Sequence, residues 1–145
     1  MIDPFWPLLG SHILGDMIFN SSRLAIFKRD ARMVLHVTGI ASHCLLHAGF
    51  AAVLLAATGW PVLGGTLLVF FSHFVIDFCR CNLEKKIYGP GRLLLNRAEL
   101  FELVRGRRQE KLPPGTKLWA AINVCDQASH LACLFALSRW LIFVR

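Results

Sequence analysis

The sequence has 145 residues, of which 55% are hydrophobic and only 17% are charged, and its mean hydropathy of +0.52 is well above that of soluble globular domains. The length allows one domain, and the composition favours an integral membrane protein over a soluble one. A formal net charge of +7 would also suit a nucleic-acid-binding protein, so the positions of the basic residues have to decide between the two classes. The first residues have neither a basic segment nor a small-residue cleavage site, and a removable signal peptide is therefore not expected.

Four apolar stretches have lengths that suit helices crossing the ~30 Å hydrocarbon core of a bilayer. They cover about residues 4–20, 33–58, 62–79 and 118–144, and the first is near the lower length limit for a span. A tight break at Gly59-Trp60-Pro61 separates the second stretch from the third. The predicted fold class is all-α: a single transmembrane domain over residues 1–145, built as an integral membrane four-helix bundle.

Two polar segments connect these spans: residues 21–32 join the first span to the second, and residues 80–117 join the third to the fourth. Within the second, residues 92–104 mix leucines with Arg, Asn and Glu, a pattern typical of a short amphipathic helix on the membrane surface. We therefore expect a short cytoplasmic amphipathic helix between the third and fourth spans.

The basic residues indicate an orientation. The two polar segments hold 14 of the 16 Lys and Arg residues, and with four spans both segments fall on the same side of the membrane. The positive-inside rule makes that side cytoplasmic, with both termini extracytoplasmic, in a bacterial inner membrane. Because topology accounts for the net charge, a nucleic-acid partner is not expected, whereas anionic lipid head groups fit the basic segments.

Each of the four spans carries two ionisable residues that are four positions apart. The pairs are His12 and Asp16, His43 and His47, His73 and Asp77, and Asp126 and His130. This spacing puts both side chains on one helix face about 6 Å apart, as when a helix offers two ligands to one metal ion. All four pairs fall between the cytoplasmic interface and the bilayer midplane, so the sequence predicts one shared site that opens to the cytoplasm.

The residue types in this site point to a transition metal. Imidazole and carboxylate groups together suit Zn²⁺, with Mn²⁺ and Fe²⁺ as alternatives. Eight candidate ligands exceed the four of a structural zinc site, which fits either two ions or one ion with surrounding carboxylates and a general base. All eight are predicted metal ligands, with Asp16, Asp77 and Asp126 as the candidate catalytic bases. Asn20, Lys28 and Gln127 are interpreted as substrate-binding or orienting residues, and His36 is expected at the periphery.

These motifs resemble an uncharacterised family of small membrane proteins of bacteria and phages. That family has His-x3-Asp-x3-Gln followed by Lys in its first span, a His-rich second span, His-Phe-x-Ile-Asp in its third and Asp-Gln-x-x-His in its last. The matching residues here run from His12 through Asn20 to Lys28, from His43 to His47, from His73 to Asp77 and from Asp126 to His130. Asn20 stands where the family has Gln. A more distant similarity to inner-membrane metal-dependent hydrolases implies the type of reaction by analogy.

The leading hypothesis is a metal-dependent hydrolase that acts on a lipid or phosphoester at the cytoplasmic face. Two alternatives use the same residues: a metal-ion or proton transporter, and a non-enzymatic membrane effector with a structural metal site or polar network. Residues 50–57 and 131–137 contain no charged side chain, which argues against a polar path to the outer face. A homo-oligomer is compatible with so small a bundle.

Overall fold

The structure, a computed structural model, describes residues 2–18, 22–92, 94–95, 99, 105 and 113–145, and the regular secondary structure of these residues is helical. The helices are α1 (Phe5–Ile18), α2 (Ser22–Phe27), α3 (Met33–Ala57), α4 (Val62–Tyr88) and α6 (Thr116–Phe143). Three of them, α3, α4 and α6, are long and apolar enough to cross a membrane. The all-α class and the presence of membrane-span candidates are thus confirmed.

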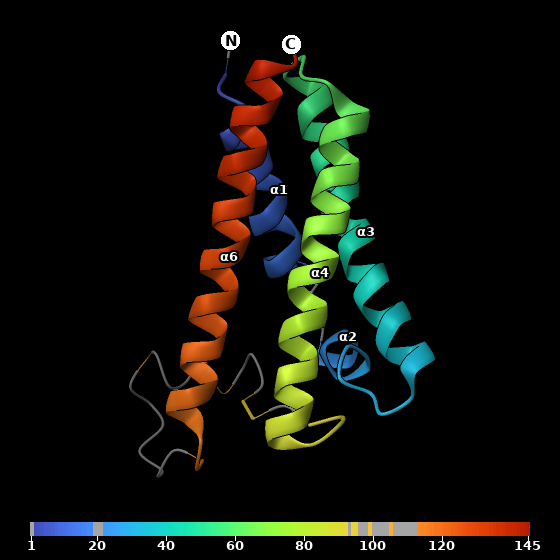
Figure 1. The fold of residues 1–145 in the computed structure, drawn as a ribbon, viewed down its shortest axis with the longest axis vertical. Helices are drawn as coiled ribbons and strands as arrows, with labels where there is room; N and C mark the ends of the chain where they lie inside the picture. Colours follow the sequence, from blue (N-terminus) through green and yellow to red (C-terminus); the bar gives the residue numbers. More distant parts are fainter. Residues whose placement is uncertain (1, 19–21, 93, 96–98, 100–104, 106–112) are drawn as a thin grey trace.

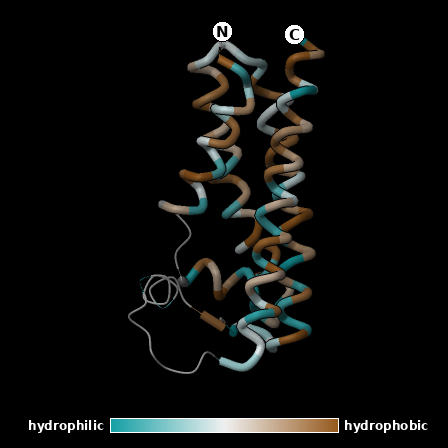
Figure 2. The backbone as a smooth tube through the Cα atoms, turned by 90° about the vertical axis from the view of Figure 1, so that its left-hand side faces the viewer, coloured by the Kyte–Doolittle hydropathy of each residue, from teal (hydrophilic) through white to brown (hydrophobic). Residues whose placement is uncertain are grey.

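The four helices that carry the polar pairs pack around a common interior. Helix α1 contacts α3 and α6, and α4 contacts the same two helices from the other side. Both termini lie at one end of the molecule, and α2 lies toward the other end (Figure 1). Hydrophobic positions occur along the full length of the long helices, with hydrophilic positions interspersed (Figure 2).

Helix α1 is the shortest of the four helices that carry the polar pairs. It has 14 residues, which at 1.5 Å per residue make about 21 Å, less than a bilayer core. It descends from the terminal end to about the middle of the bundle (Figure 1). Its start is fixed by Asp3, whose Oδ1 accepts a hydrogen bond from the Phe5 amide at 2.9 Å. The lower half of the bundle is therefore reached by three long helices, and α2 packs there against α3.

Two glycines allow the short helices to approach α3 closely. A Cβ on Gly15 of α1 would lie 2.5 Å from Cε1 of His47, and one on Gly39 of α3 would lie 2.9 Å from the Lys28 backbone nitrogen. Any larger side chain at either position would push a helix or a site residue away. Glycine at these positions thus brings α1 onto a site histidine and the end of α2 onto α3.

The interior is divided between apolar and polar layers. The largest apolar cluster contains Leu8, Ala51, Leu55, Trp60, Val69, Leu134, Leu137 and Leu141. Trp60 follows the end of α3, so this cluster fills the half of the bundle nearer the termini. A smaller cluster of Ile40, Cys44 and Cys81 lies between α3 and α4, supported by Phe70, Phe74 and Phe78. The polar pairs lie beyond the first cluster, toward α2.

Two polar segments differ from their sequence-based description. Helix α4 continues past residue 79 to Tyr88, because the mostly covered Arg80 and the buried Glu84 form ion pairs instead of entering water. The segment 21–32 contains α2, and the Lys28 and Arg29 that follow it are buried. The predicted amphipathic helix over 92–104 falls largely outside the described residues.

Candidate metal centre

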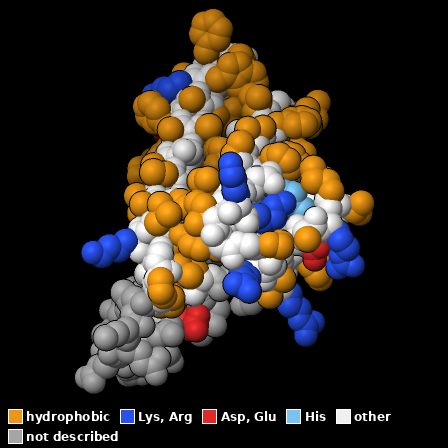
Figure 3. Space-filling model, turned by 60° about the horizontal axis from the view of Figure 1, so that its bottom comes forward, with side chains coloured by type: hydrophobic (Ala, Val, Ile, Leu, Met, Phe, Trp, Pro, Cys, Tyr) orange, Lys and Arg blue, Asp and Glu red, His pale blue; other side chains and the backbone are white. Residues whose placement is uncertain are grey.

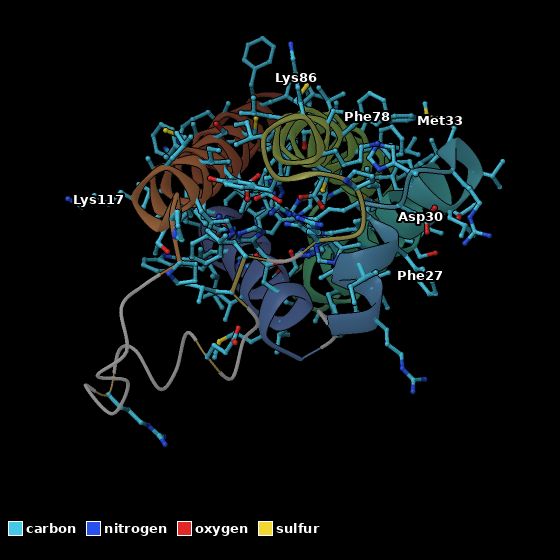
Figure 4. All side chains as sticks on the ribbon, turned by 90° about the horizontal axis from the view of Figure 1, so that it is seen from below. Phe27, Asp30, Met33, Phe78, Lys86 and Lys117 are labelled. Carbon is cyan, nitrogen blue, oxygen red and sulfur yellow. The ribbon has the colours of Figure 1, made fainter. Side chains whose placement is uncertain are left out.

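The structure brings all eight predicted ligands into one cluster. Seven of them are buried, and Asp16 is partly exposed. Seen from the α2 end, nitrogen and oxygen atoms gather in the space enclosed by α1, α3, α4 and α6, whereas the labelled Met33, Lys86 and Lys117 point outward (Figure 4). Three overlapping groups have ligand atoms within 4.8 Å of one another. They are Asp16 with His43, His47 and His73; His12 with His73 and His130; and Asp77 with Asp126 and His130.

Asp16, His43 and His47 form a triangle with the dimensions of a zinc site. Oδ1 of Asp16 lies 3.3 Å from Nε2 of His43 and 3.4 Å from Nε2 of His47, and these two nitrogens are 3.1 Å apart. Ligands about 2.0–2.1 Å from a tetrahedral Zn²⁺ are about 3.3 Å from one another. The three atoms therefore match one face of a tetrahedron, and a ring nitrogen of His73 lies within 4.8 Å of each of them.

The same contacts are poorly satisfied by hydrogen bonds alone. Two imidazole nitrogens and one carboxylate oxygen face one another, and each neutral ring has only one N–H to donate. Nε2 of the neighbouring His73 is also buried and has no hydrogen-bond partner among the described residues. A cation among these atoms would satisfy the facing lone pairs, so the donor set fits a bound metal ion.

Ring packing extends the cluster across the bundle. The His73 ring stacks on the His47 ring at 3.9 Å between centroids, and its centroid also lies 3.9 Å from that of the His130 ring. The His12 ring lies farther away, with its centroid 5.1 Å from those of His73 and His130. Positive charge on several neighbouring rings would be repulsive, which favours neutral imidazole, the form that binds metals.

The three aspartates have different partners. Oδ2 of Asp77 accepts a hydrogen bond from Lys28 Nζ at 2.8 Å, and its Oδ1 accepts one from Arg80 Nη2 at 3.0 Å. Oδ1 of Asp126 lies 3.1 Å from Arg80 Nε. Asp16 instead contacts only imidazoles and Gln127, with no Lys or Arg within ion-pair distance among the residues described. Asp16 is therefore the carboxylate whose charge is free to bind a metal ion.

A buried ion-pair network continues from the cluster toward α2. Arg80 also contacts Glu84, and Arg29 donates hydrogen bonds to the same carboxylate. The network and the cluster together contain three cations and four carboxylates: Lys28, Arg29 and Arg80 against Asp16, Asp77, Glu84 and Asp126. One negative charge remains uncompensated, and uncompensated charge inside a membrane bundle is costly. One divalent cation would change this sum from −1 to +1, and a bound water that loses one proton would bring it to zero.

A small polar cavity of about 70 Å³ adjoins the cluster. It is lined by Asp16, Lys28, His43, Asp77, Arg80, Asn123, Asp126, Gln127 and His130. A space of this size holds a few water molecules. Water can therefore stand next to the ligand triangle, and two cationic side chains face the same space.

The predicted substrate-binding residues have separate outcomes. Lys28 lines the cavity, but its ammonium group is engaged with Asp77. Gln127 bridges ligands, since its Oε1 lies 3.1 Å from His12 Nε2 and its Nε2 lies within 3.4 Å of Asp16. Asn20 lies outside the described residues. His36 is in none of the three groups, as expected, but it is buried, and its Nδ1 lies 2.6 Å from the Lys28 carbonyl oxygen.

Sequence reasoning missed Arg29, Arg80 and Glu84, which complete the polar interior. A signal for two of them exists in the sequence. His73, Asp77, Arg80 and Glu84 follow one another at intervals of three or four residues and so share one face of α4. Extending the ligand face past the apparent end of the span would have identified Arg80 and Glu84.

Comparison with known proteins identifies a family for the chain but no individual relative. No curated protein and no solved structure matches it. A family model does match, over residues 5–144, which include all four polar pairs and the two cations that contact Asp77, Lys28 and Arg80. The chain therefore belongs to the family described as "Protein of unknown function (DUF3307)".

Proposed function

We propose that this protein is a membrane-embedded, metal-dependent hydrolase that acts on a lipid or other phosphoester at the cytoplasmic face. The observation that carries the proposal is the Asp16–His43–His47 triangle, with zinc-site dimensions, next to a polar cavity lined by Lys28 and Arg80. The excess of one carboxylate over the cations favours one divalent ion over two. Zinc suits this donor set best, with Mn²⁺ or Fe²⁺ as alternatives.

The proposed membrane arrangement is a four-helix bundle in which α1 is a half-length fourth member. Lys and Arg side chains gather at the α2 end of the molecule (Figure 3), which supports a cytoplasmic position for that end. The termini would then be extracytoplasmic, and the cavity would lie in the cytoplasmic half of a bacterial inner membrane.

The chemistry assigns separate tasks to the residues around the cavity. A bound metal ion would lower the pKa of a coordinated water and polarise the ester. Asp126 accepts a proton from water as the water oxygen bonds to phosphorus, and returns it to the leaving oxygen as the ester bond breaks. Arg80 and Lys28 offset the negative charge that develops on the phosphoryl oxygens. The net reaction consumes one ester and one water and releases an acid and an alcohol.

The apolar cluster on the terminal side of the site supports hydrolysis over transport. Leu8, Leu55, Val69, Leu134 and Leu141 pack there without a charged side chain among them. A transporter needs polar groups or water through that half of the bundle. An effector with a purely structural metal would differ from the proposed enzyme in showing no turnover.

The test is hydrolysis by purified protein in nanodiscs, with chromogenic phosphomonoester and phosphodiester reporters and with phospholipid. Zinc-loaded wild type should turn over at least one class, and chelation should abolish the turnover. Asp126→Asn should lower kcat by about 10²–10⁴-fold, the usual effect of losing a general base. Asp3→Asn, which alters an exposed carboxylate paired with Arg139, is the matched control and should retain activity. Metal-loaded wild type that turns over no reporter and no lipid would refute the proposal.

A further inference from the structure

A groove of about 550 Å³ runs between α4 and α6, beside the polar cavity. Its walls are Val75, Ile76, Cys79, Arg80, Leu83, Leu118, Ala121, Ile122, Cys125, Asp126 and Ser129. Most of these side chains are apolar, and Arg80 and Asp126 are the charged ones. The groove has the volume of a small-molecule binding pocket.

The groove opens to the outside of the bundle. Val75 is 59% exposed and Leu118 is 50% exposed, on the two helices that form its sides. Both helices are membrane-span candidates. In a membrane, the medium in contact with this opening is the hydrocarbon of the bilayer.

The groove and the polar cavity share a wall. Arg80 and Asp126 line both spaces, and they are the only two residues common to the two linings. Arg80 Nε lies 3.1 Å from Asp126 Oδ1, but neither atom makes a hydrogen bond with a described residue. Of the three Arg80 ion pairs, this is the one that is not also a hydrogen bond, so an anionic group can replace Asp126 beside the guanidinium.

From this continuity we infer that the groove holds an acyl chain of a phospholipid, which enters from the bilayer with its phosphate directed to Arg80. The inference rests on the proposed function, for which it names the substrate class. Within its apolar walls the groove holds one cation, Arg80, for the phosphate, and Arg80 also lines the polar cavity beside the ligand triangle. A helix of a second copy fits less well, because an apolar helix face would have to cover the charges of Arg80 and Asp126 within the groove.

The length of the groove also suits an acyl chain. It extends from Val75 to Leu83 along α4, which at 1.5 Å per residue is about 12 Å. A packed partner helix would contact α4 and α6 over several more turns. A chain that lies in the groove has its head group at the depth of Arg80 and Asp126, where the cavity begins.

The test is lipid retention by the full chain, measured by native mass spectrometry after release from nanodiscs of phosphatidylglycerol. Ala121→Phe fills the groove, and Ala120→Phe places the same side chain on an exposed neighbouring position outside it. Wild type and Ala120→Phe should retain phosphatidylglycerol, and Ala121→Phe should lose at least about tenfold in lipid occupancy. Glycerol phosphate, which has no acyl chain, should not be retained by any variant.

Two further measurements separate the explanations. Ala121→Phe should keep the metal content and thermal stability of Ala120→Phe, which excludes misfolding as the cause of lipid loss. Arg80→Gln should remove the preference for phosphatidylglycerol over uncharged diacylglycerol. Equal lipid retention by Ala121→Phe and Ala120→Phe would overturn the groove assignment, as would a dimer that only Ala121→Phe abolishes. Lipid retention that depends on Ala121 in a protein without metal or turnover would support the groove and refute the hydrolase.

Discussion

Asp16→Asn should separate metal binding from folding. The substitution keeps an oxygen at the corner of the ligand triangle, 3.3 and 3.4 Å from the two α3 nitrogens, but removes its charge. Loss of residues that only support a ligand weakens metal binding by about 10–100-fold, so loss of the anionic ligand itself should exceed about 100-fold. Because no described Lys or Arg contacts Asp16, the metal-free variant should be as stable as metal-free wild type or more stable.

The assay is thermal unfolding of chelated protein in detergent, followed with and without added Zn²⁺. At a zinc concentration 100 times its Kd, wild type should gain about 2.7 kcal/mol in the free energy of unfolding. The variant, with its Kd raised at least 100-fold, should gain no more than about 0.4 kcal/mol at the same concentration. Asp77→Asn is the contrasting variant: it weakens the buried pairs with Lys28 and Arg80, so it should lower stability in the absence of metal.

Zinc that stabilises Asp16→Asn as much as wild type would contradict a metal ligand at Asp16. Asp16→Asn that destabilises the chelated protein as strongly as Asp77→Asn does would contradict it as well. The first result would remove Asp16 from the metal site. The second would show that its carboxylate stabilises the fold, not a bound cation.

Three further predictions concern the surroundings of the site. Gly15→Ala places a Cβ 2.5 Å from the His47 ring and should reduce zinc affinity in a binding titration. Gly10→Ala, whose added Cβ would have its nearest neighbour at 3.5 Å, should leave zinc affinity unchanged. Equal zinc affinities of the two variants would contradict the close packing of α1 on His47. Glu84→Gln leaves Arg29 and Arg80 short of a buried counter-charge and should cost about 3–5 kcal/mol in denaturant unfolding while metal stoichiometry stays unchanged. Acidification should release the metal, because protons compete for the imidazole nitrogens. The release is followed with a zinc-sensitive dye, and zinc that stays bound at pH 4 would contradict histidine ligation.

The sequence was sufficient to predict the composition of the site, because each polar pair has helical spacing within an apolar stretch. It could not specify which carboxylate is free. That depends on Lys28 and Arg80, which come from a predicted surface segment and from the apparent end of a span, and both turn inward to Asp77. The free carboxylate is set by ion pairs between residues far apart in the chain, and the spacing of residues along one helix carries no information about them.

The position of the first helix shows a second limit. Apolar composition predicted a span over about residues 4–20, and α1, which covers Phe5–Ile18, lies between the terminal end and about the middle of the bundle. Composition measures whether a segment tolerates lipid, not where its helix lies in the bundle. The close approach at Gly15, which places α1 on His47, also depends on packing that the sequence does not reveal by itself.

The central claim, a metal ion held by Asp16, His43 and His47, is tested most directly by metal analysis combined with X-ray absorption on protein purified without chelator. We expect about one zinc per chain, with nitrogen and oxygen ligands at about 2.0–2.1 Å and an imidazole scattering pattern. His43→Ala/His47→Ala should lose the metal, and His36→Ala, which alters a buried histidine outside the ligand groups, should retain it. Protein that carries no transition metal, or a double variant that keeps its metal, would contradict the account.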